Sequence, residues 1–334
     1  MLLRRALLAA LLPPLLSGCP AEKTPAPGAG QPGMPAPTQT AEAAPPTTVT
    51  ALAPPSTASP PVPSASAPPA SSGAAPRALT AIHVPSSVGA ERRPFVLLLH
   101  GLGASGKVLE TAIGLPAFAE ERRFVWAAPD GAMNGKGQRF WNASKACCNF
   151  ENSPVDHVAE LRKTLDEATA LPSVDPKRVW VVGISNGAFM AQRLACEVDG
   201  LAGVVSISGS GPAEGERCAP RAPVAVIEVH GDADAIIRYN GGQALGRPDV
   251  ARHPSALETV TGWAVRDHCG PKPEAGGTMD LDDKLDGAET SVLKFPGCAR
   301  PVELWTVHGG SHYLATEKKM DEAIIDYIDK HPRP

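Results

Sequence analysis

Short runs of apolar residues, many of them β-branched, recur from residue 79 to residue 307. Such runs are typical of parallel strands that are buried on both faces. The sequence predicts strands at residues 95–99, 124–128, 179–182, 203–208, 223–229, 291–295 and 302–307, with an edge strand at residues 79–84. Helical spacing or helix-forming residues predict helices at residues 108–120, 155–170, 188–195, 255–268 and 317–329. The alternation predicts an α/β fold with a mostly parallel central sheet and helices on both faces.

The predicted strand Val179–Val182 leads into Gly183-Ile184-Ser185-Asn186-Gly187, and a helix-forming stretch follows. The pattern G-x-S-x-G between a strand and a helix is the nucleophile elbow, whose sharp turn lifts a serine hydroxyl above the sheet and points a helix N-terminus at it. In a chain with 32 glycines the pentapeptide alone says little, so the prediction depends on its flanks and on partner residues downstream. Ser185 is the candidate nucleophile.

A general base is expected on the loop that follows the predicted strand 302–307, which reads His308-Gly309-Gly310-Ser311-His312. The glycines allow this loop to fold back towards Ser185, which makes His312 the candidate base. His308 stands at the end of the strand and is the alternative.

An acid is expected after the predicted strand 223–229, because a carboxylate there can hold the imidazole in one tautomer and stabilise its positive charge. Asp232 and Asp234 are the two candidates, and Asp234 is preferred because apolar Ile236 and Ile237 follow it. The order serine, acid, histidine along the chain is that of the α/β-hydrolases.

The strand 95–99 ends in His100-Gly101-Leu102-Gly103, a loop of the kind that supplies one backbone N–H to an oxyanion hole. The second N–H comes from the residue after the nucleophile. This assigns the amides of Leu102 and Asn186 to the oxyanion hole, while His100 is interpreted as a structural residue beneath the loop.

Two other side chains near the predicted site have competing interpretations. Trp141 follows a predicted strand, where loops of an open α/β sheet form the binding crevice, so it could line the site and stack on substrate. The alternative is a core tryptophan held by nearby disulfides. Asp156, at the start of the helix 155–170, is interpreted as a capping residue rather than a catalytic one, with His157 beside it.

Six cysteines follow Cys19, and an even number in an exported domain indicates disulfides. Cys269 with Cys298 is the preferred pair and Cys196 with Cys218 the second, which leaves adjacent Cys147 and Cys148 either to pair with each other or to reach across the fold. The usual C-x-x-C spacing is missing, so we expect neither a zinc site nor thiol-redox chemistry.

The N-terminus carries a processing signal. Residues 1–18 contain Arg4 and Arg5, a short apolar core and a Leu-Ser-Gly sequence before Cys19, which resembles the lipidation motif of bacterial lipoproteins; an ordinary secretory signal is the alternative. Residues 19–76 are so rich in Pro, Ala and Ser that they predict a disordered tether, and residues 77–334 form the catalytic domain. We therefore expect an exported, membrane-anchored lipoprotein, periplasmic or at the cell surface, with its lipid on Cys19.

The charge balance excludes one class of partner. Without Arg4 and Arg5 the chain has 29 basic and 35 acidic residues, a net charge of −6, and it has no arginine cluster. Nucleic acid is therefore not an expected partner.

Several segments together carry a family resemblance: LLLHGLGASG, VDPKRVWVVGISNGAFMAQRLAC, VIEVHGDADAIIRY and VHGGSH. Over most of residues 93–313 the chain resembles the exported polyhydroxybutyrate depolymerase and feruloyl esterase family of α/β-hydrolases. The resemblance implies the α/β-hydrolase fold, cleavage of carboxylic esters without a metal or organic cofactor, and Ser185, Asp234 and His312 as the triad. Where that family commonly has tryptophan and proline after the catalytic histidine, this chain has Tyr313, which we expect to border the acyl pocket and contact substrate.

The sequence thus predicts an extracytoplasmic serine esterase that acts on feruloyl or related polysaccharide or aryl esters through an acyl-enzyme. A polyhydroxybutyrate depolymerase is the alternative substrate class, and a peptidase would usually need an additional domain. A non-catalytic cell-surface binding lipoprotein is the alternative of another class.

Overall fold

The computed structural model describes residues 80–314 and 318–334. The predicted signal peptide (1–18) and all of the predicted tether (19–76), including the predicted lipid-attachment residue Cys19, therefore lie outside the described residues. Within the described part of the chain, no helix is long and apolar enough to cross a membrane.

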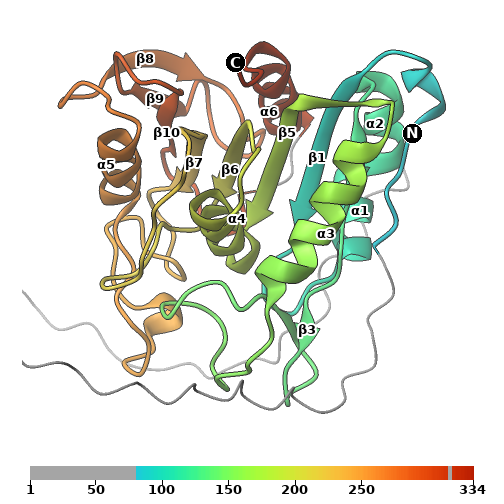
Figure 1. Ribbon diagram of the computed structural model, residues 1–334. Helices are drawn as coiled ribbons and strands as arrows, with labels where there is room; N and C mark the ends of the chain where they lie inside the picture. The colour runs from blue at the N-terminus through green and yellow to red at the C-terminus, as the bar shows by residue number, and fades with distance from the viewer. Residues whose placement is uncertain (1–79, 315–317) are drawn as a thin grey trace, which may run out of the picture. The chain divides into compact units, whose positions relative to one another are not determined.

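An eight-stranded sheet forms the centre of the domain, in the order β2-β1-β5-β6-β7-β10-β9-β8 (Figure 1). The strands from β2 to β10 run parallel, and β9 and β8 are antiparallel to their neighbours. This confirms the predicted α/β-hydrolase fold with a mostly parallel sheet. The strands are β1 Arg93–Leu99, β2 Val125–Ala127, β5 Val174–Ile184, β6 Gly203–Ile207, β7 Ala225–Gly231, β8 Glu274–Met279, β9 Thr290–Lys294 and β10 Val302–Val307. A separate pair consists of β3 Ala132–Met133 and β4 Arg139–Phe140.

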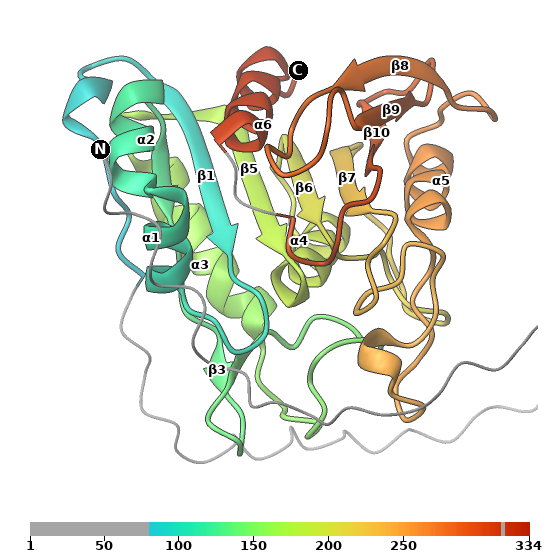
Figure 2. The same cartoon turned by 180° about the vertical axis from the view of Figure 1, so that it is seen from behind.

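Helices cover both faces of the sheet, as Figures 1 and 2 show from opposite sides. Alternate residues of β1 enter two cores: Phe95 and Leu97 pack with α3, α4 and α5, whereas Val96 and Leu98 pack with α1, α2 and α6. Both faces are buried, which explains the unbroken apolar runs of the sequence. The helices are α1 Gly106–Ile113, α2 Leu115–Arg122, α3 His157–Ala170, α4 Asn186–Glu197, α5 Ala256–Arg266 and α6 Lys318–Lys330, with 3₁₀ turns η1 Ser86–Val88 and η2 Ala244–Gly246.

Three of the differences from the sequence prediction have a clear local cause. The prediction of an edge strand at residues 79–84 is wrong. Of its described residues only His83 has a β-type pairing, which is an isolated bridge with Trp126. The helix at residues 108–120 is divided into α1 and α2, because Gly114 adopts a left-handed conformation (φ 65°) that ends the first helix. The polar stretch after Cys269 contains the edge strand β8, whose residues are mostly exposed and so show no apolar run.

Three disulfides are present among the described residues. Cys269 pairs with Cys298 and Cys196 with Cys218, as the sequence predicted. Cys147 and Cys148 pair with each other, which settles the alternative that the sequence left open.

A buried acid lies at the C-terminal end of α5. Asp267 is fully buried (0% exposed). Burial raises the pKa of its carboxyl to about 7, although the Val224 amide and the Arg300 and Arg266 guanidinium groups oppose the rise. The Arg300 guanidinium donates instead to backbone carbonyls, including that of Ala202 at 3.2 Å. The folded protein therefore favours the neutral acid, and its stability falls as the pH rises from the ordinary carboxyl pKa to about 7.

Asp267→Asn is expected to raise the free energy of unfolding by about 1–2 kcal/mol at pH 8, because the amide carries no charge that burial penalises. At pH 4, where Asp267 is protonated in the folded state, the gain should disappear. Urea denaturation at both pH values measures the effect, with the exposed Asp286→Asn as the control. A loss of stability at pH 8 would show that Asp267 is instead an ionised partner of Arg300.

Candidate active site

A strained turn places Ser185 at the end of β5 and the start of α4. Ser185 has φ 54° and ψ −119°, a conformation that is unfavourable for a residue with a side chain. The two flanking glycines make the turn possible, because a Cβ on Gly183 would lie 2.1 Å from the carbonyl oxygen of Gly187. This is the nucleophile elbow that the sequence predicted.

The loops after β7 and β10 bring an acid and an imidazole to this serine. The Ser185 Oγ lies 2.9 Å from His312 Nε2, and His312 Nδ1 lies 2.7 Å from Asp234 Oδ2. With Nδ1–H donating to the carboxylate, Nε2 is free to accept the serine proton. His312 and Asp234 are buried (8% and 5% exposed), so the interactions between these groups are weakly screened by solvent.

The Asp234 carboxylate is held ionised. Its Oδ1 accepts hydrogen bonds from the amides of Ile236 (2.8 Å) and Ile237 (2.9 Å). Burial alone would raise the pKa of Asp234, but hydrogen bonds with His230 and His312 and the amide of Ile236 outweigh burial and hold it well below the ordinary range. A permanent negative charge therefore faces His312 at neutral pH.

The alternative acid and base, Asp232 and His308, pair with each other rather than with Ser185. His308 Nδ1 lies 2.9 Å from Asp232 Oδ2, and the Ser291 hydroxyl lies 2.8 Å from His308 Nε2. Asp232 Oδ1 also accepts the amide of Gly309 at 2.7 Å. The His308 side chain is 55% exposed, so this second group lies at the surface, where it fixes the start of the loop that carries His312.

The predicted oxyanion loop lies directly beside the elbow. A Cβ on Gly101 would be 3.4 Å from the Cβ of Ser185. Among the described residues, neither the Leu102 amide nor the Asn186 amide has a hydrogen-bond acceptor. The Asn186 side chain is fixed by the backbone of Trp141, with Oδ1 accepting at 2.7 Å and Nδ2 donating at 3.1 Å. Both amides are thus free to bind a negatively charged oxygen next to Ser185.

Trp141 does not line an open site. It is 1% exposed, and its indole N–H donates to the carbonyl of His100 at 2.9 Å. The indole shares a core cluster with Cys147 and Cys148. The prediction that Trp141 stacks on substrate was therefore wrong, and the core alternative holds, because the loop folds over the ring and satisfies its only polar atom.

His100 and His157 have structural hydrogen bonds. His100 is 1% exposed; its Nδ1 donates to the carbonyl of Gly101 (2.8 Å) and its Nε2 accepts from the amide of Gly131 (2.9 Å). His157 is fully buried, and its Nδ1 accepts from the amide of Asn142. Asp156 caps α3 by accepting the Ala159 amide at 3.0 Å, as the sequence analysis proposed.

Tyr313 is the exposed aromatic residue next to the base. It is 77% exposed, and its ring centroid lies 5.4 Å from that of His312. The structure therefore leaves this ring accessible beside the reacting groups.

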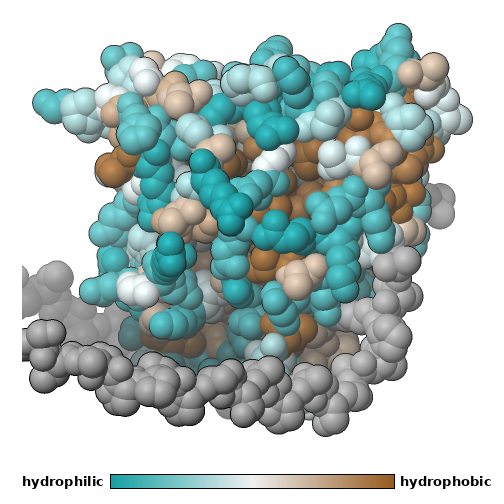
Figure 3. All heavy atoms as spheres, viewed as in Figure 1, coloured by the Kyte–Doolittle hydropathy of each residue, from teal (hydrophilic) through white to brown (hydrophobic). Residues whose placement is uncertain are grey.

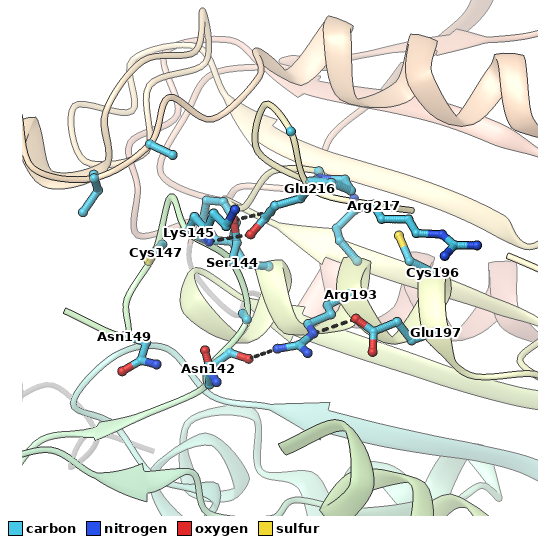
Figure 4. A pocket seen from close by; sticks show the side chains of 18 of the residues that line it. Asn142, Ser144, Lys145, Cys147, Asn149, Arg193, Cys196, Glu197, Glu216 and Arg217 are labelled. Atoms are coloured by element: carbon cyan, nitrogen blue, oxygen red, sulfur yellow. Dashed lines mark hydrogen bonds and ion pairs between the residues drawn. The ribbon is translucent and has the colours of Figure 1, made fainter. Parts of the chain in front are cut away.

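A cavity of about 770 Å³ lies between α4 and the loop that follows β4. Ser185 is not among the residues that line it. In Figure 4 the Arg193 side chain points towards Glu197, and the Glu216 side chain points towards Ser144 and Lys145. Glu197 pairs with Arg193 at 2.8 Å, and Glu216 accepts the Ser144 hydroxyl at 2.8 Å. No cluster of three metal-ligating His, Cys, Asp or Glu side chains occurs among residues 80–314 and 318–334.

Sequence reasoning gave no role to Glu228 and His230, which lie behind Asp234. Glu228 is 0% exposed and His230 is 1% exposed. The only indication in the sequence that they have a role is that they are two polar residues in the otherwise apolar strand β7.

An elbow serine within reach of a histidine and a buried aspartate, at the edge of a mostly parallel sheet, defines a serine hydrolase of the α/β-hydrolase fold. The family model described as phospholipase/carboxylesterase matches residues 85–247. Over these residues the chain is similar to the phospholipase/carboxylesterase family of α/β-hydrolases. Among solved structures, the acetyl xylan esterase from Aspergillus awamori has the same fold, with a TM-score of 0.50 at 13% identity over 74% of this chain and 92% of that one.

Three curated relatives carry esterase or depolymerase names. The chain is 32% identical over 238 residues to the putative esterase NocK of Nocardia uniformis subsp. tsuyamanensis, covering 66% of this chain and 65% of that protein. It is 24% identical to feruloyl esterase B of Piromyces equi, covering 67% and 40%. It is 33% identical to poly(3-hydroxyalkanoate) depolymerase C of Paucimonas lemoignei, covering 75% and 47%. The chain thus spans less than two thirds of the length of each.

Proposed function

We propose that this protein is a serine esterase that hydrolyses carboxylic esters through an acyl-enzyme. The observation that carries the proposal is the unbroken hydrogen-bonded chain from Ser185 through His312 to Asp234, with distances of 2.9 and 2.7 Å. The match of residues 85–247 to the phospholipase/carboxylesterase family model supports the same reaction class.

In this mechanism His312 Nε2 takes the proton of Ser185 as its Oγ attacks the ester carbonyl. The oxyanion is bound by the amides of Leu102 and Asn186, each of which contributes about 3 kcal/mol in comparable sites. The imidazolium then protonates the leaving alcohol, and Asp234 stabilises its charge throughout. Water, activated by the same imidazole, attacks the acyl-enzyme and releases the acid.

For the substrate we favour feruloyl or related aryl esters, including those carried by polysaccharides. The similarity to a protein named feruloyl esterase B supports this class. The exposed ring of Tyr313 beside His312 can stack on an aromatic acyl group at the reacting centre.

Polyhydroxyalkanoate is the second substrate class, supported by the similarity to depolymerase C. An enzyme that adsorbs to a water-insoluble polyester needs a contiguous apolar surface. Figure 3 shows apolar areas interrupted by hydrophilic residues on the face that it presents. The large exposed apolar side chains lie on several elements of the described chain, two of them on α5: Val84, Val108, Met133, Leu245, Leu257, Val265 and Tyr313.

The purified protein is expected to hydrolyse methyl ferulate and p-nitrophenyl acetate, and to release little soluble acid from poly(3-hydroxybutyrate) granules. Chromatography of released ferulate and titration of released acid measure the three activities, and the Ser185→Ala protein serves as the blank. Granule hydrolysis faster than ferulate release would reverse the choice of substrate. Inactivity on all three, together with failure of a fluorophosphonate to label Ser185, would favour the non-catalytic binding lipoprotein.

We also propose that the protein is exported and anchored to a membrane by a lipid on Cys19. The signal-like residues 1–18 and the Leu-Ser-Gly sequence before Cys19 support this location. Three disulfides among the described residues fit an oxidising compartment.

Cys19→Ala is expected to abolish incorporation of labelled palmitate and to move the protein from the membrane fraction to the soluble exported fraction, because the proposed lipid anchor can no longer be attached. Fractionation and autoradiography in a bacterial host measure both effects, and Cys298→Ala is the control for loss of a cysteine elsewhere. Membrane association that survives in Cys19→Ala would contradict the lipid anchor.

A further inference from the structure

Two ionisable side chains of β7, Glu228 and His230, are buried behind Asp234. Glu228 is 0% exposed, His230 is 1% exposed, and Asp234 follows in the loop at 5%. Ionisable groups this deeply buried are tolerated when they pair with each other. The hydrogen bonds show how these three are paired.

Both ring nitrogens of His230 face acceptors only. Nδ1 lies 3.2 Å from Glu228 Oε1, while Nε2 lies 2.7 Å from the carbonyl oxygen of Ile237 and 3.3 Å from Asp234 Oδ2. A neutral imidazole has a lone pair on one nitrogen, which would here face a carboxylate or a carbonyl oxygen. With both carboxylates ionised, the geometry favours the doubly protonated, positively charged ring.

The electrostatic environment agrees with the geometry. Burial lowers the pKa of His230, but the hydrogen bonds with Asp234 and Glu228 outweigh burial and raise it to about 9. The ring thus remains charged through the pH range in which an esterase base titrates.

Few other titratable groups face this ring. The rings of Tyr239 and His230 form a T-shaped pair with a centroid distance of 5.7 Å, and the Tyr239 hydroxyl is hydrogen-bonded to the Thr306 hydroxyl. Buried His253 has a pKa lowered first by its own burial and then in part by the charge of His230. Asp234 lies between this ring and His312 and contacts both.

Two neutral side chains surround the Glu228 carboxylate on the side away from His230. Gln192 Nε2 donates to Glu228 Oε2 at 3.1 Å, and Trp263 Nε1 donates to Gln192 Oε1 at 2.5 Å. Glu228 is thereby fixed on one side by an amide and on the other by His230. The imidazolium is held between two carboxylates.

The Asp234 Oδ2 atom is shared between two imidazoles, His312 at 2.7 Å and His230 at 3.3 Å. We propose that His230 is a positioning residue: its buried positive charge orients Asp234 and balances the carboxylate, so that His312 stays neutral and able to accept the serine proton near neutral pH. The inference depends on the esterase reaction proposed above. Without the cation, Asp234 would stabilise the His312 imidazolium more strongly, and less free base would exist at pH 6–7.

The test is the pH dependence of kcat/KM for p-nitrophenyl acetate in His230→Gln, which keeps an amide donor but removes the charge. The acid limb of the profile is expected to move up by about one pH unit, with activity recovering at high pH to within about fivefold of the wild type. His308→Gln, which changes the exposed imidazole that pairs with Asp232, is the matched control and should leave the limb in place.

His230→Gln leaves Glu228 buried without a cation and could lower the folded fraction. The double variant Glu228→Gln/His230→Gln removes both charges together and should shift the acid limb in the same direction but by less, because Glu228 lies on the far side of His230 from Asp234. An acid limb that stays in place in both variants, or activity that falls equally at every pH, would overturn the proposal.

A readout without substrate separates this inference from the proposed function. In NMR titrations of the wild type, the Cε1–H of His230 should show no titration between pH 5 and 8, and that of His312 should titrate higher in the double variant. If the wild type hydrolyses no ester, the proposed function fails, while the titration still tests the charge on His230. A His230 that titrates near its ordinary value would overturn the inference even in an active esterase.

Discussion

Ser185→Ala is expected to lower kcat for p-nitrophenyl acetate by about 10³- to 10⁶-fold, as loss of a serine nucleophile does in other hydrolases. The alanine removes the oxygen that forms the acyl bond, whereas the oxyanion amides and His312 remain. Stopped-flow or spectrophotometric release of p-nitrophenol measures the effect. The positive φ of Ser185 costs alanine and serine about the same, so the substitution adds no backbone strain and the variant should keep its fold. Circular dichroism checks the fold.

Ser291→Ala is the matched control for this prediction. Ser291 also bonds a histidine that bonds an aspartate, at 2.8 and 2.9 Å. It lies in the strand β9 rather than on an elbow between a strand and a helix. Its removal should change kcat less than about twofold, as expected for a surface substitution away from the reacting groups. A loss at Ser291 that equals the loss at Ser185 would show that the wrong serine has been assigned.

Asp234→Asn is expected to lower kcat by about 10⁴-fold, as the same substitution does in a serine protease. An asparagine cannot stabilise the imidazolium, and its amide N–H can donate to Nδ1 and so hold His312 in the tautomer that cannot take the serine proton. The remaining activity should rise at high pH, where hydroxide replaces the general base.

Asp232→Asn separates the two acids. Asp232 is partly exposed and bonds His308 and the amide of Gly309, so its substitution loosens one end of the loop without touching the charge at His312. The expected loss of kcat is less than about tenfold, of the size that one exposed ion pair can produce. A larger loss for Asp232→Asn than for Asp234→Asn would contradict the assignment of the acid.

Local chemistry made most elements readable from the sequence. The strands β1, β6, β7 and β10 are buried on both faces, so each appears as an apolar run. The edge strand β8 is mostly exposed and carries no such pattern, and it was not predicted. The division between α1 and α2 depends on the left-handed conformation of a single glycine, Gly114, which composition does not determine.

The sequence by itself determined the elbow at Ser185 and the loops that carry its partners. G-x-S-x-G between a strand and a helix is a local pattern, and this fold requires the acid and the histidine to follow it in that order along the chain. It narrowed the acid to Asp232 or Asp234 and the base to His308 or His312. Only the tertiary structure decided which of each pair faces Ser185, since residues two or four apart on a loop point in directions set by contacts with other strands. Tertiary structure also buried Trp141 and gave His230 two carboxylate partners, because both depend on side chains that packing, and not sequence proximity, brings together.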